Sequence, residues 1–572
     1  MSDTLSGLVA LLFLFGWLTT SHVSPWVSWH AELTVFAAAF CVAWMAVAPA
    51  VRRGGALALA MPQATWPLLV LGVCAVIQFV LGQIDFGGTA LAALLYVLLA
   101  LVSIGLGTTA TAGIRDPHAA LFAPRRIQVD EWLAGSVIVV AVLSVGVGLA
   151  QVLQVLDDSS WILRTVDSRR AAGNVGQPNH LATLLVMSVA SAVYLCSIER
   201  LGRGVMALCL GFMLLALVAT GSRSGVLGLT LVVLWWIWKQ PVVTPGITRW
   251  WVFPFVIGFA TLYLLWPKLL ALYDMAGHGG IARIAESTAD PRLTVWPQLL
   301  EAVGQRPWFG WGIRDTAEAH AAVVHAYDRS LPLTYSHNLL IDLAIWVGLP
   351  LTLLMTVASL YWLWSRARSI DGPKAWFGLA VALPLGLHSM LEFPFAYAYL
   401  LAPAMVGIGM VEGAVRPVSA LTINARLAAV FLATFTALAA WTVVDYVRAE
   451  EDFRLARFEM LRIGPEGQAD NPAKVYLLTQ LEAVNEAGRL QLKPGMRPEE
   501  IETLRRVADH YAWSGARYRY VTALVLNGET VEASRQMRIL RAQHGSELHD
   551  KLKRQLDAEV AAYSRSTDSV SN

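Results

Sequence analysis

Long apolar runs recur along most of this 572-residue chain, and they limit the folds that are open to it. A membrane-spanning helix needs about 20 consecutive, mostly apolar residues, and a window of that length predicts roughly thirteen such helices. They are expected at residues 4–20, 31–51, 64–82, 89–109, 132–156, 180–198, 205–220, 225–239, 250–267, 338–364, 375–390, 396–412 and 425–447. Because hydrophobic residues make up 56% of the sequence and charged residues only 15%, the chain is predicted to be an all-α polytopic membrane protein.

Basic residues in the connecting loops predict the orientation, because Lys and Arg are held on the cytoplasmic side of a membrane. Successive loops alternate between the two sides of the membrane, and three of the loops that are thereby placed outside contain neither Lys nor Arg: 21–30, 83–88 and 391–395. An odd number of spans then leaves the N-terminus in the cytoplasm and the C-terminal tail in a bacterial periplasm, with the chain in the inner membrane. Two other outer loops break the rule, one with Arg164, Arg169 and Arg170 and one with Arg223. Exceptions to a topological rule are candidates for function.

Two hydrophilic segments interrupt or follow the apolar runs. A long periplasmic loop is expected at about 267–336, and its residues 291–303 place apolar side chains at the spacing of an amphipathic surface helix. Residues 448–572 are rich in charge, and within them 518–540 has the pattern of one tetratricopeptide-like helix pair. The predicted domains are therefore a transmembrane domain at 1–447, which includes the loop, and a periplasmic helical domain at 448–572.

Polar residues gather where the predicted outer loops enter the apolar runs. Ionisable residues at membrane depth are costly and tend to mark a substrate path. The candidates are Arg169, Arg170, Gln177, Asn179, His180, Arg223, Arg292, His337, Asn338 and Glu392. Because all of them are predicted on the outer side, we expect them to form one periplasmic site.

The residue types in this set indicate what the site binds. A guanidinium group is permanently charged and can donate two parallel hydrogen bonds to phosphate oxygens. Several arginines within a membrane are therefore suited to bind a lipid diphosphate. A histidine can accept the proton of an attacking hydroxyl near neutral pH, and we expect His337 to do so. Arginine can neutralise the charge that develops on a leaving diphosphate. The predicted reaction is displacement of that diphosphate from a sugar carbon.

Each candidate also has a purely structural interpretation. His337 could act only as a hydrogen-bonding residue at a helix start, and Arg223 could anchor a helix end to lipid headgroups. Arg292 could be a surface charge on the amphipathic helix. The turn at residues 177–180 could be a plain helix start, capped by Asn179. Glu392 is harder to interpret in this way, because a carboxylate between two apolar runs needs a partner.

Several classes of protein are disfavoured by what the sequence lacks. It contains no metal-ligand set, no phosphate-binding loop and no glycine-rich dinucleotide turn, which argues against ATP-driven transport and redox chemistry. The formal net charge of +2 is too small to suggest a nucleic-acid partner. The missing motifs therefore suggest that the chain needs neither a metal nor another cofactor.

Six short motifs occur in the order seen in the O-antigen ligase and polymerase superfamily. They are GNVGQPNHLATLL at 173–185, GSRSG at 221–225, DPRLTVW at 290–296, PWFGWG at 307–312, SHNLL at 336–340 and LEFPFAYAY at 391–399. More narrowly, the chain resembles the bacterial protein O-oligosaccharyltransferases, which are the pilin glycosylation ligases. The Gln177–His180 turn, the early loop at 22–26 and the segment at 392–394 favour this branch.

This resemblance implies transfer of a whole oligosaccharide from undecaprenyl diphosphate to serine or threonine hydroxyls of periplasmic proteins such as pilin. By position, His337 corresponds to the essential loop histidine of the family, and Arg223 and Arg292 correspond to the arginines assigned to the diphosphate. Gln177, Asn179 and His180 match the turn that is specific to the branch, whose role is less settled. Arg169, Arg170, Asn338 and Glu392 complete the set of residues expected to bind substrate.

Three other functions stay open at this point. A fourth, a scaffold that uses the C-terminal helices to assemble other machinery, would leave the arginine and histidine cluster unexplained. Ligation of O-antigen onto lipid A core and polymerisation of O-antigen repeat units share the same chemistry and differ only in the acceptor. The additional soluble domain favours a protein acceptor. A transporter of lipid-linked glycan is a more distant alternative, because it would be expected to show internal repeats and a continuous polar path, whereas the polar residues here gather on one side.

Overall fold

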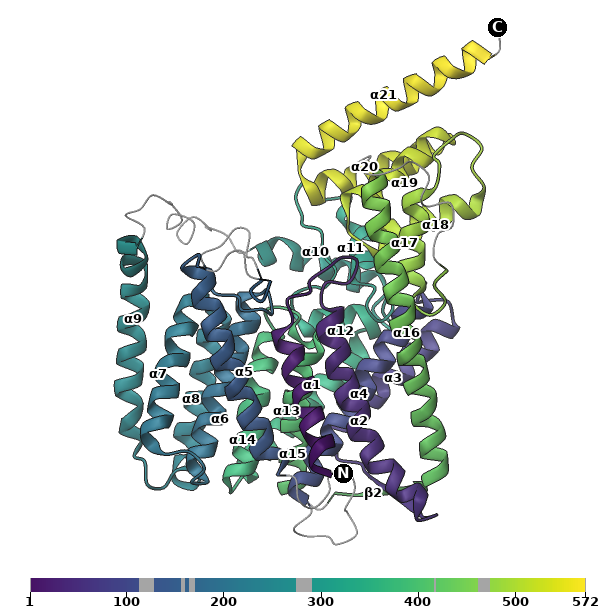
Figure 1. Ribbon diagram of the computed structural model, residues 1–572. Coiled ribbons are helices and arrows are strands. Elements are labelled where there is room, and N and C mark those ends of the chain that lie inside the picture. The colour runs from purple at the N-terminus through teal and green to yellow at the C-terminus, as the bar shows by residue number, and fades with distance from the viewer. Residues whose placement is uncertain are drawn as a thin grey trace. The chain divides into compact units, whose positions relative to one another are not determined.

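The computed structural model describes residues 2–112, 128–155, 160–163, 170–273, 291–415, 418–460 and 474–570. Helices predominate, as Figure 1 shows. Within these described ranges, nine helices are long and apolar enough to cross a membrane. The prediction of an all-α polytopic membrane protein is therefore confirmed, with one small exception in the strand pair β1 (Ala56–Ala60) and β2 (Ala420–Asn424). The expected number of about thirteen spans stays a prediction.

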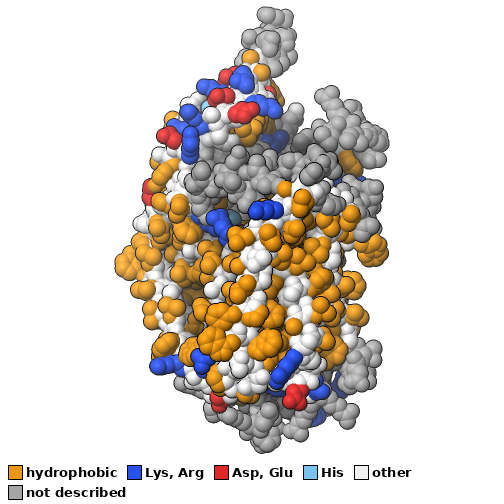
Figure 2. Space-filling model, turned by 90° about the vertical axis from the view of Figure 1, so that its left-hand side faces the viewer, with side chains coloured by type: hydrophobic (Ala, Val, Ile, Leu, Met, Phe, Trp, Pro, Cys, Tyr) orange, Lys and Arg blue, Asp and Glu red, His pale blue; other side chains and the backbone are white. Residues whose placement is uncertain are grey.

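The apolar helices leave much of their hydrophobic surface exposed. On the face shown in Figure 2, hydrophobic side chains cover a broad band, and charged side chains lie toward its edges. Helix α9 (Val252–Tyr273) is an example, because Ile257 is 62% exposed and Leu264 is 73% exposed. A helix that presents large apolar side chains outward is suited to contact lipid.

Each predicted span except one coincides with a single helix. The apolar helices before the long loop, besides α9, are α1 (Ser2–Leu18), α2 (Trp29–Arg52), α3 (Thr65–Val80), α4 (Gly87–Ala112), α5 (Val129–Val152), α6 (Pro178–Ser197), α7 (Arg203–Thr220) and α8 (Arg223–Val243). Those after the loop are α12 (Leu339–Val347), α13 (Leu349–Ser369), α14 (Pro373–His388), α15 (Ala398–Val415) and α16 (Ala425–Met460). The agreement is close because hydropathy is a local property of each segment.

The prediction of one continuous helix at 338–364 was wrong, because the chain breaks at Gly348 between α12 and α13. Gly348 has a φ of +83°, which residues with a side chain rarely adopt. A Cβ atom there would also lie 2.4 Å from the carbonyl oxygen of Trp308. The break is held by a hydrogen bond of 2.7 Å from the Leu349 N–H to the Pro307 carbonyl. Helix α12 is consequently a short separate element that begins two residues after His337.

The chain forms two compact units, each built from three separate segments. The first unit comprises Met1–Leu71, Leu95–Thr288 and Val357–Ala439. The second unit comprises Gly72–Leu94, Ala289–Thr356 and Ala440–Asn572. The expected boundary at 447/448 falls inside helix α16, and the division into a transmembrane and a periplasmic domain stays a prediction.

Helices α6, α14 and α15 contribute many of the buried residues in the core of the first unit, together with α5 and α7. A Cβ atom at Gly378 of α14 would lie 2.4 Å from the Gly407 carbonyl oxygen of α15, so these two helices approach through glycine. Small residues allow this kind of backbone contact between membrane helices. The α14–α15 connection, with its 3₁₀ turn at Pro394–Ala396, therefore joins two closely packed helices.

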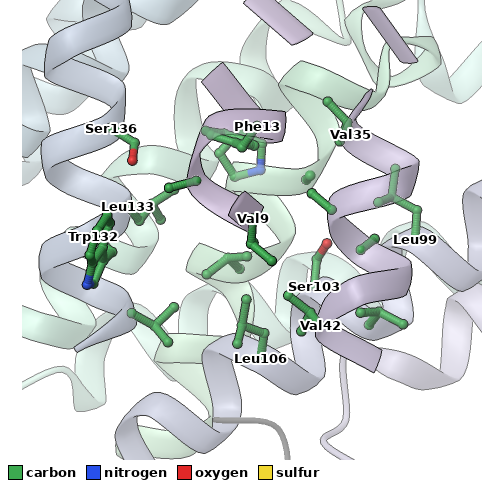
Figure 3. A pocket seen from close by; sticks show the side chains of 18 of the residues that line it. Val9, Phe13, Val35, Val42, Leu99, Ser103, Leu106, Trp132, Leu133 and Ser136 are labelled. Carbon is green, nitrogen blue, oxygen red and sulfur yellow. The ribbon is translucent and has the colours of Figure 1, made fainter. Parts of the chain in front are cut away.

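An apolar cavity of about 150 Å³ lies between α1, α2, α4, α5 and α15 of the first unit (Figure 3). Val9, Phe13, Val35 and Leu99 are among its lining residues. None of the side chains that line it is ionisable. The cavity therefore offers space for hydrocarbon but no group that could perform acid–base chemistry.

The second unit combines two helices from the long loop with the C-terminal helices. The loop helices are α10 (Pro291–Gln305) and α11 (Thr316–Val324), and the C-terminal helices are α17 (Thr479–Arg489), α18 (Pro498–His510), α19 (Ser514–Leu526), α20 (Thr530–His544) and α21 (Ser546–Val570). Ala321 and Val324 of α11 pack in one buried cluster with Ile539 and Ala542 of α20. Helices α19 and α20 form the pair that the sequence pattern predicts, and its assignment as a tetratricopeptide repeat stays a prediction.

Candidate active site

The first cluster of candidate residues is built on the N-terminal turn of α6. Gln177 is its N-cap, because the Gln177 Oε1 accepts a hydrogen bond of 2.9 Å from the His180 N–H, and Pro178 occupies the first helical position. Asn179 was the expected capping residue in the structural interpretation, and that expectation was wrong. Because Gln177 provides the cap, the Asn179 side chain is left to make other contacts.

Glu392 has the partners that a carboxylate in this setting requires. The Asn179 Nδ2 donates to the Glu392 Oε1 at 2.6 Å, and the Gln177 Nε2 donates to the Glu392 Oε2 at 3.1 Å. The Glu392 side chain is 13% exposed. The connection between α14 and α15 therefore holds a carboxylate against the start of α6. We call Gln177, Asn179, Arg170 and Glu392 the Glu392 cluster.

Arg170 joins this cluster through neutral acceptors. The Arg170 Nη2 donates to the Asn179 Oδ1 at 3.3 Å, and the Arg170 Nε donates to the Thr220 carbonyl at 2.7 Å. Burial lowers the pKa of Arg170, the Glu392 carboxylate opposes this effect, and the charge of Arg223 adds to it. The Thr220 carbonyl that accepts from Arg170 lies three residues before Arg223, so Arg170 sits beside the turn that leads into α8.

Arg223 is the first residue of α8 and is exposed. The preceding Ser222 caps the helix, since its Oγ accepts a hydrogen bond of 3.0 Å from the Gly225 N–H. A Cβ atom at Gly225 would lie 2.6 Å from the Cβ of Ala182, so the glycine lets α8 approach α6. The positive end of the helix dipole and the guanidinium of Arg223 both favour an anion at this position.

His180 lies behind the turn and is only 3% exposed. Its Nδ1 and the Tyr399 hydroxyl oxygen are 2.9 Å apart, and its ring centroid is 4.4 Å from that of Tyr397. Of the three predicted residues on this turn, Gln177 and Asn179 contact Glu392 directly. His180 instead packs against Tyr397 and Tyr399, on the buried side of the turn.

His388 belongs to the same network but was not among the candidates. It is the last residue of α14 and is 1% exposed. Its Nδ1 lies 2.8 Å from the Thr183 Oγ1, and its Nε2 lies 3.4 Å from the Glu392 Oε2. His388 lies within the apolar run predicted at 375–390, so its hydropathy gave no sign of a role in the site. The spacing of four residues between His388 and Glu392 was the signal that could have found it.

The second cluster surrounds His337 in the second unit. His337 has a φ of +59°, in the left-handed region that residues with a side chain rarely adopt. Asn338 directly after it is the N-cap of α12, because its Oδ1 accepts hydrogen bonds of 3.0 Å from the Leu340 N–H and 3.3 Å from the Ile341 N–H. Asn338, which was expected to bind substrate, therefore has a capping role in this structure.

Three elements hold the backbone next to His337. Asp342 of α12 is fully buried, and its Oδ1 accepts hydrogen bonds of 2.9 Å from the Ser336 N–H and 2.9 Å from the Thr316 Oγ1 of α11. The Trp296 Nε1 of α10 donates to the Ser336 carbonyl at 3.0 Å. We call residues 336–338, fixed in this way, the His337 loop.

Arg292 lies in the first turn of α10, on the same helix as Trp296, and is partly buried. The second unit contains His337, Asn338 and Arg292. The first unit contains the other described candidates, which are Arg170, Gln177, Asn179, His180, Arg223 and Glu392. Arg169 lies outside the described residues. The assembly of the two clusters into one site stays a prediction.

The chain matches three described protein families. The description "Protein glycosylation ligase" matches residues 171–196, which contain the turn at the start of α6. The description "O-Antigen ligase" matches residues 208–356, which contain Arg223, Arg292 and His337. The description "Virulence factor membrane-bound polymerase, C-terminal" matches residues 376–557, which contain His388 and Glu392.

Two curated proteins from Acinetobacter baylyi are similar to this chain. A general O-oligosaccharyltransferase is 22% identical over 550 residues, which cover 94% of this chain and 92% of the relative. A ComP-specific O-oligosaccharyltransferase is 29% identical over 273 residues, which cover 46% of this chain and 48% of the relative. The first of these alignments covers 94% of the chain, so it includes both the Glu392 cluster and the His337 loop.

Proposed function

This chain is a homologue of bacterial O-oligosaccharyltransferases, and we propose that it transfers an oligosaccharide en bloc from undecaprenyl diphosphate to serine or threonine hydroxyls of periplasmic proteins such as pilin. The observation that carries the proposal is the Glu392 cluster, in which Arg170 is held by two neutral acceptors, one of which, the Thr220 carbonyl, lies three residues before Arg223. Two guanidinium groups that keep their charge are suited to bind a diphosphate.

In the proposed reaction, the chain's own side chains provide both proton transfer and charge neutralisation. An imidazole nitrogen of His337 accepts the proton of the acceptor hydroxyl while that oxygen bonds to the anomeric carbon of the glycan. The bond between that carbon and the diphosphate oxygen breaks, and the electron pair leaves with the diphosphate. Arg223 and Arg292 neutralise the charge that develops on it, and Arg169 and Arg170 help to bind the carrier.

Direct displacement of this kind inverts the anomeric configuration. Retention would instead need a carboxylate nucleophile, for which Glu392 is the candidate. Both Glu392 oxygens accept amide hydrogen bonds, from Asn179 and from Gln177. Such bonds stabilise the carboxylate and reduce its tendency to attack carbon. These contacts support inversion, with Glu392 organising the donor side.

The proposed setting is the bacterial inner membrane, with the N-terminus in the cytoplasm and the C-terminal helices in the periplasm. Both clusters would then face the periplasm, where a lipid-linked glycan and a secreted acceptor protein meet. The isoprenoid of the donor would lie among the membrane helices. The helices after α16 are the part of the chain proposed to present the acceptor protein.

Two related activities compete with this proposal, because family descriptions for an O-antigen ligase and for a membrane-bound polymerase also match. The test is transfer in a bacterial host that lacks its own ligase, supplied with one lipid-linked glycan and with both a pilin-type protein and lipid A core. Glycan on the protein is the expected result. Glycan only on lipid A, or a ladder of lengthened lipid-linked glycan, would assign the chain to one of the competing activities, and no product would favour the transporter.

A further inference from the structure

The turn at residues 307–312 presents two large aromatic side chains on the surface of the second unit. Trp308 is 69% exposed and Phe309 is 81% exposed, whereas Trp311 in the same turn is 6% exposed. Single apolar residues are common on protein surfaces, but neighbouring ones that join a larger apolar patch mark an interaction surface. We call Trp308 and Phe309 the aromatic pair.

The backbone of this turn is fixed by contacts with the elements beside it. The Trp311 N–H donates to the Ile345 carbonyl of α12 at 2.6 Å. A Cβ atom at Gly310 would lie 2.4 Å from the same carbonyl oxygen, so the turn packs on α12 through glycine. The hydrogen bond from Leu349 to Pro307 holds the beginning of the turn. The outward direction of the aromatic pair is therefore a fixed feature of the fold.

The turn lies where the apolar helix α3 ends and the apolar helix α13 begins. Gln78 is in the last turn of α3, where its Nε2 donates to the Trp346 carbonyl at 2.7 Å and its Oε1 accepts from the Ile313 N–H at 3.0 Å. Leu349, whose N–H binds Pro307, is the first residue of α13. Both helices coincide with predicted spans, and the predicted topology places these two ends on the outer side of the membrane.

Both helices expose large apolar side chains near these ends. In the last turn of α3, Ile77 is 50% exposed and Val80 is 75% exposed. In the first two turns of α13, Leu353 and Leu354 are each 66% exposed. Such side chains are suited to contact lipid, and the aromatic pair continues this apolar surface onto the loop. Tryptophan is enriched at this level of a membrane protein, where the apolar layer meets water.

A cation directly before the turn distinguishes a membrane from an apolar protein partner. Arg306 is exposed, and its guanidinium carbon lies 4.0 Å from the centroid of the Trp311 ring. A guanidinium beside exposed aromatic rings is suited to bind the phosphates of anionic lipid headgroups while the rings enter the apolar layer. A purely apolar partner would give this charge no role.

We propose that the aromatic pair is a bilayer anchor that inserts into the headgroup region of the outer leaflet. The anchor acts on the His337 loop as well, because the turn is bonded to α12, which begins two residues after His337. It goes beyond the proposed function, since it assigns a lipid contact to a segment outside the spanning helices and does not depend on the reaction.

The experiment attaches a fluorescent probe at residue 309 of the full-length protein in vesicles of phosphatidylethanolamine and phosphatidylglycerol. Phe309→Cys is made in a background in which the four native cysteines are replaced by alanine. Two quenchers are compared, which are phospholipid brominated near the headgroup end of its acyl chains and iodide in the water. Val531→Cys is the matched control, because Val531 is an apolar residue of the second unit that is 85% exposed at the start of α20.

Brominated lipid should quench the probe at residue 309 severalfold more strongly than the probe at residue 531, and iodide should show the opposite order. Quenching at residue 309 by iodide alone would overturn the proposal, because the aromatic pair would then face water, as a surface for a partner protein does. Protection from both quenchers would also overturn it, since a second copy of the chain would then cover the pair. If Phe309→Cys does not accumulate, Trp308→Cys carries the probe and should give the same order. The measurement needs neither donor nor acceptor, so it does not depend on the proposed function.

Discussion

The carboxylate of Asp342 accepts a hydrogen bond of 2.9 Å from the backbone N–H of Ser336, the residue that directly precedes His337. The left-handed conformation of His337 costs about 1–3 kcal/mol and persists only where its surroundings enforce it. Asp342 supplies part of that enforcement, because it also binds the Thr316 hydroxyl and is fully buried. A buried carboxylate therefore links α11 and α12 to the proposed catalytic base.

Replacing Asp342 should consequently impair transfer, although the substitution removes no side chain that is proposed to contact the substrate. Asp342→Ala leaves the Ser336 N–H without its acceptor, at a cost of about 1–3 kcal/mol, and we expect transfer to fall about tenfold to a hundredfold. Asp342→Asn keeps an acceptor oxygen and should retain most of the activity. Asp328→Ala, an exposed position between α11 and the His337 loop, is the matched control. Equal activity of the Asn and Ala variants would contradict this role.

His337→Ala should reduce transfer at least about a hundredfold, because it removes the proposed general base. The variant should insert normally and keep its affinity for undecaprenyl diphosphate, since the loss concerns proton transfer. His325→Ala, at the end of α11, is the control for loss of a histidine from the same segment. Transfer to a pilin-type protein in the ligase-deficient host is the measurement, and substantial residual activity would remove His337 from its proposed role.

Arg223→Ala should raise the KM for the lipid-linked donor, and Arg223→Lys should restore only part of the loss. Lysine keeps the charge but not the two parallel hydrogen bonds that a guanidinium makes with phosphate oxygens. Arg200→Ala is the control, because Arg200 is 57% exposed and pairs with Glu131 at 2.9 Å. If Arg223→Ala changed only the turnover number, Arg223 would act on the leaving group alone and would not bind the donor.

The second unit should lose stability as the pH rises, in part because of Glu318. Burial, followed by the charges of Asp509 and Asp85, raises the pKa of the Glu318 carboxyl to about 7. A carboxyl group with a raised pKa binds its proton more tightly in the folded state than in the unfolded state. Its contribution to stability is therefore complete below its ordinary pKa of 4.5 and is lost as the pH rises to about 7.

Glu318→Gln removes this titration, so the variant should lose less stability than the wild type between about pH 5 and about pH 8, by an amount on the order of 3 kcal/mol. Thermal unfolding of the full-length protein in detergent at both pH values measures the difference. Titrating groups that do not interact with Glu318 cancel in the comparison, because both proteins contain them, whereas its neighbour Asp315 loses a charge that raises its pKa. Glu529→Gln at the exposed start of α20 should behave like the wild type. Identical pH dependence of Glu318→Gln and wild type would show that Glu318 does not titrate in this range.

Much of the helical framework was predictable, whereas the break at Gly348 was not. Hydropathy places apolar residues in helices without reference to the rest of the chain, which is why α2, α6 and α15 lie close to the predicted spans. Gly348 occurs within an apolar run that reads as one helix. Its φ is positive, and the Trp308 carbonyl, forty residues earlier in the chain, leaves no space for a side chain there. Such an approach has no local signature.

The sequence by itself determined the class of this protein, the positions of most of its helices and the residue types of its candidate site. These features depend on single segments of the chain, because each apolar segment enters lipid by its own hydropathy and arginine and histidine carry their own chemistry. Only the tertiary structure decided which side chains meet. Glu392 contacts Gln177 and Asn179 across 215 and 213 residues, His388 joins them from the end of α14, and Asp342 supports the His337 loop. These contacts depend on how helices pack against each other, and no periodicity in the sequence records that packing.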